Sequence, residues 1–274
     1  MLRRNSSLHR GQLWLYLVLI ALTVLAMAGL RNCRNHSNAP SLRHSGGDTI
    51  DVAIEYSPVS FYSYADTMGG FNYDFLRLVA AHHGCKFKFH PIVSLSAALS
   101  QLQDGVFDIL AAQFPVTAEN RKLFLFTEPL YIDRQVLVQR RDPAGALIVK
   151  SQLDLAGRTV RVVAGSPMKQ RIMGLSREIG DTIRVIEDSQ YGPEQIFLLV
   201  ATGDDSLAVI NEAVARRLAQ RYPQVDISTG ISFSQFQALT LRKGDMALCD
   251  SLNLWIRQLK ATRDYESLSR RYLK

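Results

Sequence analysis

The sequence lacks the patterns that mark common enzyme sites. Its 274 residues contain no Gly-x-Ser-x-Gly elbow, no Walker phosphate loop and no dinucleotide-binding glycine pattern. Its three cysteines show no metal-ligand spacing. Only His82, His83 and His90 follow residue 47, and the adjacent pair does not share one helix face as zinc ligands do. We therefore expect no catalytic residue, no metal and no cofactor.

Acidic residues are absent from the first 47 positions, which hold six arginines and so carry a charge of +6. Residues 48–274 hold 26 basic and 25 acidic side chains and add only +1 to the net charge of +7. This part is nearly neutral and shows no basic stripe interleaved with aromatics. Nucleic acid is therefore not expected as a partner.

An apolar run at residues 13–30 follows a basic stub, residues 1–12. Its length is at the lower limit for a membrane-spanning helix, and the positive-inside rule puts the stub in the cytoplasm. We predict a single-pass anchor in the inner membrane, with the folded domain in the periplasm. The alternative is a signal peptide cleaved after Ala26-Met27-Ala28, which releases the domain into the periplasm. Residues 31–47 have the composition of a flexible tether.

From residue 49 onward, strand and helix patterns alternate. Strands are predicted at residues 49–55, where apolar and polar residues alternate, at residues 86–91, and at residues 107–112, which read as a buried strand. Helical spacing at residues 73–82 and 95–102 predicts the helices between them. This order predicts an α/β fold with a parallel sheet, whose strand carboxyl ends form a binding edge.

A second block repeats this alternation. Strands are predicted at residues 158–164, 182–186 and 207–211, and helices at residues 166–176, 193–201, 212–220, 249–260 and 265–272. Between the third and fourth of these helices, a segment at residues 225–228 precedes the return of the chain through residues 236–241. Ser166 followed by Pro167 is typical of an N-cap and a first helical residue, and such a helix end can hold an anion.

Residues 113–131, QFPVTAENRKLFLFTEPLY, form a polar, turn-rich loop followed by an apolar run. This pattern is typical of a binding loop on a rigid scaffold. Cys85 and Cys249 would lie in an oxidising compartment, so a disulfide is possible, but two separate buried thiols are the interpretation we favour.

In this order, the pieces resemble the family 3 extracellular solute-binding proteins from about Asp48 to the end. The resemblance is carried by an aromatic loop, by GFNYD at residues 70–74, by Thr117, and by FTEPLY and LDLAGRTV at residues 126–131 and 153–160. The anchored form is similar to the amino-terminal, non-catalytic domain of membrane-bound lytic murein transglycosylase F.

The resemblance implies a two-lobed periplasmic-binding-protein-like fold that closes on a ligand, each lobe a mostly parallel sheet flanked by helices. Lobe 1 would comprise residues 48–138 with 235–274, and lobe 2 residues 143–230. Glu266-Ser267 resembles the catalytic pair of lytic transglycosylases, but it lies in the final helix with no room after it for a lysozyme-like domain. The resemblance therefore implies a binding module and no catalytic domain.

The departures from the family pattern concern the ligand. In amino-acid-binding members, an arginine in the loop after Thr117 holds the ligand carboxylate, and an aspartate at the end of the lobe 2 strand holds the ligand ammonium. Here Asn120 and Asn211 stand at these positions, with Arg121 and Glu212 one residue later. Two interpretations stay open: a neutral polar ligand, or substitution by Arg121 and Glu212 after local adjustment.

The candidate ligand-binding residues lie in the aromatic loop, the polar loop and the ends of the lobe 2 strands. Tyr56, Phe61 and Tyr62 form an aromatic wall or cover the core, and Ser166 holds a ligand or only caps its helix. The full set is Tyr56, Phe61, Tyr62, Gln113, Thr117, Asn120, Arg121, Tyr131, Ser166, Asn211 and Glu212.

These features predict a membrane-tethered binding or sensory module for a small polar ligand, amino-acid-like or derived from the cell wall. Its partner would then be a peptidoglycan-processing enzyme. The alternatives are the substrate-binding component of an ABC-type amino-acid transporter, with a permease as partner, and a dehydratase-like enzyme on the same scaffold.

Overall fold

The computed structural model describes residues 49–65 and 67–273. The folded unit begins at Thr49, and the predicted membrane segment and tether lie outside the described residues. No helix in the described part is long and apolar enough to cross a membrane.

The first lobe contains a five-stranded sheet in the order β4-β1-β5-β14-β6. Strand β1 pairs in parallel with β4 and β5, whereas β14 runs antiparallel to β5 and β6. Almost every residue of β1 is buried, as expected for a central strand covered on both faces. The bounds are β1 Ile50–Glu55, β4 Phe87–Ile92, β5 Ile109–Ala111, β6 Phe124–Phe126 and β14 Thr240–Arg242.

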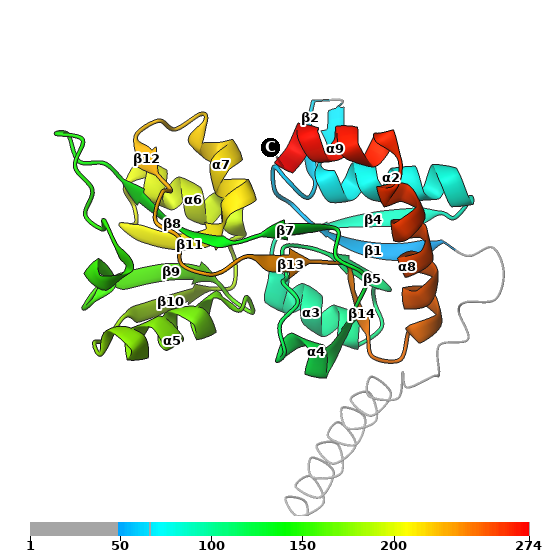
Figure 1. Ribbon diagram of the computed structural model, residues 1–274, viewed down its shortest axis with the longest axis horizontal. Helices are drawn as coiled ribbons and strands as arrows, with labels where there is room; N and C mark the ends of the chain where they lie inside the picture. The colour runs from blue at the N-terminus through cyan, green and yellow to red at the C-terminus, as the bar shows by residue number, and fades with distance from the viewer. Residues whose placement is uncertain (1–48, 66, 274) are drawn as a thin grey trace, which may run out of the picture. The chain divides into compact units, whose positions relative to one another are not determined.

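The helices of this lobe lie around its sheet (Figure 1). They are α2 Phe71–His83, α3 Leu95–Gln103, the short α4 Asn120–Leu123, α8 Met246–Lys260 and α9 Arg263–Leu273, and a small hairpin joins β2 Tyr62–Tyr64 to β3 Thr67–Gly69. Helix α2 begins after Gly70, whose φ is +126°, and a Cβ at that position would lie 2.3 Å from the Ser60 carbonyl oxygen. Only glycine fits this start, because the backbone is left-handed and the neighbouring chain is close.

The second lobe contains a sheet in the order β10-β9-β11-β8-β12. Strand β9 is parallel to β10 and β11, and β8 is antiparallel to β11 and β12. The elements are β8 Gln135–Arg140, η1 Gln152–Leu155, β9 Thr159–Val163, α5 Met168–Ile179, β10 Arg184–Asp188, α6 Pro193–Thr202, β11 Leu207–Asn211, α7 Glu212–Ala219 and β12 Val225–Asp226.

Two crossover strands run between the sheets (Figure 1). Strand β7, Tyr131–Asp133, carries the chain from lobe 1 to lobe 2, and β13, Gln235–Gln237, brings it back. The two strands pair antiparallel to each other. This paired connection places both chain crossings side by side.

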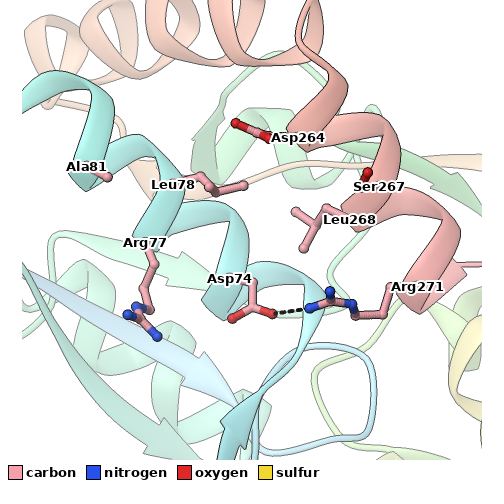
Figure 2. A pocket seen from close by; sticks show the side chains of 8 residues that line it. All are labelled: Asp74, Arg77, Leu78, Ala81, Asp264, Ser267, Leu268 and Arg271. Atoms are coloured by element: carbon pink, nitrogen blue, oxygen red, sulfur yellow. Dashed lines mark ion pairs between the residues drawn. The ribbon is translucent and has the colours of Figure 1, made fainter.

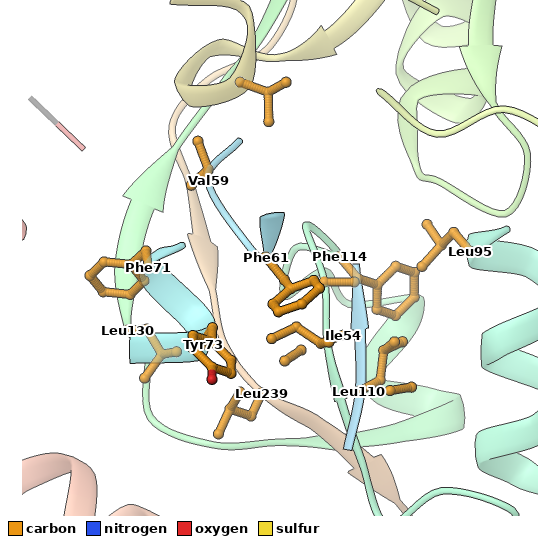
Figure 3. Packing of buried hydrophobic residues seen from close by; sticks show 14 of the residues in the cluster. Ile54, Val59, Phe61, Phe71, Tyr73, Leu95, Leu110, Phe114, Leu130 and Leu239 are labelled. Atoms are coloured by element: carbon orange, nitrogen blue, oxygen red, sulfur yellow. The ribbon is translucent and has the colours of Figure 1, made fainter. Parts of the chain in front are cut away.

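The core of lobe 1 is packed with aromatic and aliphatic side chains close to the strand ends. Phe61 lies beside Ile54 and Tyr73, and Phe114 lies nearby (Figure 3). The rings of Phe61 and Tyr73 meet edge to face, with centroids 5.3 Å apart. This packing fixes the loop after β1 against the sheet.

The predicted alternation of strands and helices is confirmed, with boundaries shifted by a few residues. The return segment expected at residues 236–241 forms two strands, β13 and β14, with a break at Ala238-Leu239. The break exists because Thr127 bonds Leu239 through both its amide and its hydroxyl. Each sheet is mostly parallel, as expected: only β14 in lobe 1 and β8 in lobe 2 run opposite to the other strands of their sheets, because each directly follows a crossover between the lobes.

The helix start predicted at Ser166-Pro167 is wrong. Helix α5 begins at Met168 with Pro167 at the N-cap, and the Ser166 hydroxyl donates to the Val163 carbonyl oxygen at 2.6 Å. The hydroxyl thus closes the turn after β9. Cys85 and Cys249 are both free thiols, and burial raises the pKa of each.

Candidate functional site

Four polar side chains enter the interior where the lobe 1 strands end. Glu55 ends β1, Gln113 follows β5, Tyr131 begins β7 and Gln237 ends β13. Tyr131 and Gln237 are opposite each other in the β7–β13 ladder. Their exposed fractions are 3%, 3%, 8% and 1%, in that order of residues. We call Glu55, Gln113, Tyr131 and Gln237 the buried polar cluster.

The buried polar cluster has hydrogen-bonding groups without partners. Among residues 49–65 and 67–273, no group bonds Glu55 Oε2, the Tyr131 hydroxyl, or either side-chain amide atom of Gln113 and Gln237. A buried polar atom without a partner costs about 1–3 kcal/mol. A polar ligand that reached these atoms would supply the missing partners.

Burial sets the charge of the cluster. It raises the pKa of Glu55 to about 7, although the Ser57 side chain and the Gln113 backbone partly offset the effect. Burial also raises the pKa of Tyr131 well above its usual value, and the negative charges of Asp133 and Glu55 add to this shift. Glu55 is thus a carboxyl group whose ionisation depends on what lies beside it.

The polar loop after β5 is held by its own hydrogen bonds. Thr117 Oγ1 accepts from the Asn120 backbone N–H at 3.1 Å, and Asn120 Nδ2 donates to the Pro115 carbonyl oxygen at 3.0 Å. Arg121 is exposed on α4. The structure brings Thr117 and Asn120 together, but Asn120 is engaged within the loop, so its predicted contact with a ligand stays a prediction.

The edge of lobe 2 is also bonded internally. Asn211, at the end of β11, donates through Nδ2 to Asp133 Oδ2 at 3.3 Å. Glu212 accepts from Arg134 Nε at 2.6 Å and from Arg216 at 2.8 Å. Arg134 is the main cause that lowers the pKa of Glu212. Both lobe 2 candidates therefore face the crossover strand β7 rather than standing free.

The aromatic loop divides into a buried and an accessible part. Phe61 belongs to the core, whereas Tyr56 and Tyr62 are half-buried. The rings of Tyr56 and Phe61 meet at 6.2 Å between centroids. An accessible ring resting on a buried one suits a pocket wall better than Phe61 itself does.

Sequence reasoning missed Glu55, Gln237 and Asp133. In the structure, residues 131–135 alternate: Tyr131, Asp133 and Gln135 are buried while Ile132 and Arg134 are exposed. Polar residues in the buried phase of a strand mark a polar interior. For Glu55, the only signal was its place at the end of a buried strand.

The two lobes touch beyond the crossover strands. A Cβ added to Gly165, in the turn after β9, would lie 3.2 Å from Ser96 Cα at the start of α3. A Cβ added to Gly192 would lie 3.4 Å from the Val93 carbonyl oxygen. These glycines let the facing edges of the lobes approach closely.

Cavities in the described part of the chain include one at α7 and one along α9. One, of about 230 Å³, is lined by β7, by the start of α7 and by Leu273, and includes Asp133, Arg134 and Glu212. The other, of about 380 Å³, lies between α2 and α9 (Figure 2), where Arg271 pairs with Asp74 at 3.9 Å. The second is lined only by these two helices and belongs to no strand end.

Two α/β lobes, joined by paired crossover strands and with polar groups buried at the strand ends, define a two-lobed ligand-binding protein. The chain belongs to the bacterial extracellular solute-binding proteins, family 3, which it matches over residues 49–274.

Relatives within this family differ in length. Membrane-bound lytic murein transglycosylase F of Desulfosudis oleivorans is 27% identical over 223 residues, which are 81% of this chain and 48% of that protein. The chain thus spans about half the length of this relative. The amino-acid-binding protein AabA of Dichelobacter nodosus is 26% identical over 225 residues, 80% of this chain and 84% of that protein.

Solved structures agree on the fold. An ancestral arginine-binding protein bound to arginine superposes with a TM-score of 0.72 at 23% identity, covering 82% of this chain and 98% of that one. The P235GK mutant of ArgBP from T. maritima gives a TM-score of 0.71 at 22% identity, covering 82% and 95%. The periplasmic-binding-protein-like fold implied by the sequence is therefore confirmed for the two lobes.

Proposed function

We propose that this chain is a membrane-tethered, extracytoplasmic binding module that closes its two lobes on a small polar ligand. The observation that carries this proposal is the buried polar cluster, because its unpartnered atoms lie at the strand ends where the two lobes meet. A ligand between the lobes would supply the missing hydrogen bonds. The N-terminal apolar run of residues 13–30 would hold the module at the membrane.

Glu55 favours a ligand that donates hydrogen bonds, with a cationic or amide group, whereas Nε2 of Gln113 and of Gln237 can donate to an acceptor on the same ligand. Glu55 Oε2 can only accept when ionised, and a hydrogen bond to a charged group contributes about 1.5–3 kcal/mol. A cation beside Glu55 would also offset the burial that disfavours its charge. Glu55 would therefore release its proton when such a ligand binds.

The same contacts disfavour an ordinary α-amino acid held by a charged clamp. Asn120 is bonded to Pro115, and Asn211 to Asp133. Glu212 is held by Arg134 and so is not a free partner for a ligand ammonium. A ligand carboxylate would need Arg121 to turn inward from its exposed position.

A thermal-shift panel on the full-length chain tests this function. L-arginine, L-cystine, agmatine, which is arginine without its carboxylate, and a muropeptide fragment serve as ligands. A ligand at 100 times its Kd stabilises the folded protein by about 2.7 kcal/mol. We expect agmatine to stabilise at least as well as L-arginine, and no stabilisation by any of the four would refute the ligand class.

Glu55→Gln separates binding from folding in the same assay. This variant keeps the shape but removes the charge, so we expect it to fold well and to lose the shift given by cationic ligands. Glu194→Gln is the matched control, because burial also raises the pKa of Glu194 on α6. An unchanged shift in Glu55→Gln would show that the ligand does not use this carboxyl group.

Two biological settings are supported by different relatives. The likeness to transglycosylase F supports a sensing module for cell-wall fragments that works beside a peptidoglycan-processing enzyme. The likeness to AabA, which matches over most of that protein, supports the substrate-binding role in an amino-acid transporter. Stabilisation by the muropeptide and not by amino acids would favour the first setting, and the reverse result the second.

A further inference from the structure

Asp133 joins the crossover strand β7 to the edge of lobe 2. Its exposed fraction is 7%. Its Oδ2 accepts from Asn211 Nδ2 at 3.3 Å, and its two oxygens lie 3.3 and 3.4 Å from the Ala213 backbone nitrogen, which donates to them. Oδ1 also accepts from the Arg134 backbone N–H at 2.8 Å. One carboxylate thus holds the Asn211 side chain and the first turn of α7 together.

This contact decides which way the Asn211 amide points. An ionised carboxylate only accepts hydrogen bonds, so it must face the NH2 group of the amide. Asn211 is almost completely buried. Within residues 49–65 and 67–273, none donates a hydrogen bond to Asn211 Oδ1. The carbonyl oxygen is therefore the acceptor that Asn211 still offers.

The charges around Asp133 leave it without an ion-pair partner in the described part of the chain. Arg134, directly after β7, and Arg216 on α7 both bond Glu212. Tyr131, on the same strand as Asp133, contributes a neutral hydroxyl. The partners of Asp133 are an amide and two peptide N–H groups, one of them at the start of α7, where the helix dipole favours a negative charge.

We propose that Asp133 is the positioning residue on the lobe 2 side of the site, orienting Asn211 so that its carbonyl oxygen accepts a hydrogen bond from the ligand. Asp133 also places a negative charge directly behind that amide. The ligand group selected here is a donor, such as an ammonium, a guanidinium or an amide N–H. This inference rests on the proposed function and adds to it the class of group that meets lobe 2.

The positioning itself is tested by hydrogen–deuterium exchange on the full-length chain without ligand. In Asp133→Ala, we expect the amide of Ala213 to exchange about tenfold faster or more, since its acceptor is lost, while the amides of α5 are unchanged. Asp226→Asn is the control, because Asp226 is equally buried but pairs with Arg141 at 2.6 Å. Unchanged exchange at Ala213 would overturn the proposal.

The effect on the ligand is tested by calorimetry with agmatine. Asp133→Asn should weaken binding by about tenfold, because the charge behind the Asn211 amide is removed. Asn211→Asp alone should also weaken agmatine binding, because the new carboxylate and that of Asp133 repel each other. The double variant Asp133→Asn/Asn211→Asp restores an amide–carboxylate pair in reversed order, and we expect it to recover the wild-type affinity or exceed it.

The experiments distinguish failure of the positioning role of Asp133 from failure of the proposed ligand class. A double variant that binds agmatine no better than either single variant would contradict the positioning role, since a purely structural residue would show additive losses. If agmatine and L-arginine both fail to bind the wild type, the ligand class of the proposed function falls. The exchange experiment then still decides whether Asp133 holds Asn211 and α7.

Discussion

Arg134, which lies between the lobe-connecting strand β7 and strand β8, forms a two-point ion pair with Glu212 at the start of α7. The Nε–Oε2 distance is 2.6 Å and the Nη2–Oε1 distance is 3.0 Å. Arg216, one turn further along α7, bonds the same carboxylate. A planar guanidinium held at two points fixes direction as well as distance. The connection between the lobes is therefore oriented by a charge pair.

Glu212→Gln is expected to lower the free energy of unfolding by about 1 kcal/mol, because the pair is partly exposed and screened by solvent. The pKa of Glu212 is lowered, so its contribution is present above the usual value of 4.5 and is lost as the pH falls through the lowered one. Urea unfolding at pH 7 and pH 3 measures this. Glu178→Gln, which removes an ion pair of an exposed glutamate, serves as control; equal losses in both variants would contradict the prediction.

Stability should fall as the pH rises through neutrality. Burial raises the pKa of Glu55 to about 7, so between 4.5 and 7 the folded protein binds this proton more tightly than the unfolded chain. A shift of this size corresponds to about 3 kcal/mol. Asp133, whose pKa is raised to about 6, contributes in the same direction.

Urea unfolding of the ligand-free chain at pH 5 and pH 8 checks this dependence. The wild type should be more stable at pH 5, and Glu55→Gln should lose most of the difference. A wild type that gains stability between pH 5 and pH 8 would show that Glu55 is ionised at little cost in the folded protein.

Gly70→Ala should destabilise the fold by at least about 2 kcal/mol, because an alanine there adopts a disfavoured backbone and meets the Ser60 carbonyl oxygen. Gly244→Ala is the control: its added Cβ meets no atom within 4 Å among the described residues. That change should alter stability by less than about 1 kcal/mol. Thermal unfolding of both variants measures the contrast, and similar midpoints for the two would refute it.

We expect two residues of the aromatic loop to differ in role, with Phe61 stabilising the fold and Tyr56 contacting the ligand. Phe61→Ala removes a buried ring from the core and should cost about 3–5 kcal/mol. Tyr56→Ala removes a half-buried ring and should cost clearly less, while weakening ligand binding more than it weakens the fold. Chemical denaturation together with calorimetry compares the two. A larger loss of stability in Tyr56→Ala than in Phe61→Ala would reverse the assignment.

The order of elements could be predicted because strong local patterns define them. Residues 207–211 are uniformly apolar until Asn211 and form β11 with those bounds. The return segment was harder, since the break between β13 and β14 depends on a contact of Leu239 with Thr127, which is distant in sequence. Strand direction in each sheet likewise depends on crossovers that local patterns do not encode.

The sequence predicted the binding site less completely than it predicted the fold. Comparison with the family pattern identified Asn120 as a residue that stands where an arginine is expected. Its hydrogen bond to the Pro115 carbonyl oxygen depends on the backbone conformation of the loop, which the sequence does not specify. Glu55 stands at the end of an apolar strand, where a carboxylate is as compatible with solvent as with burial. Its burial follows from Gln113 and Tyr131, which other segments bring to it.

The pairing of β7 with β13 has a mechanical consequence. Two unpaired crossover strands would let one lobe twist, slide and tilt against the other. Here the backbone pairing from Tyr131–Gln237 to Asp133–Gln235 joins β7 and β13 into one two-stranded ribbon. A two-stranded ribbon flexes across its face and resists shear in its own plane, because shear breaks its hydrogen bonds. The lobes should therefore open and close by a hinge rotation about a single axis, which leaves essentially one degree of freedom.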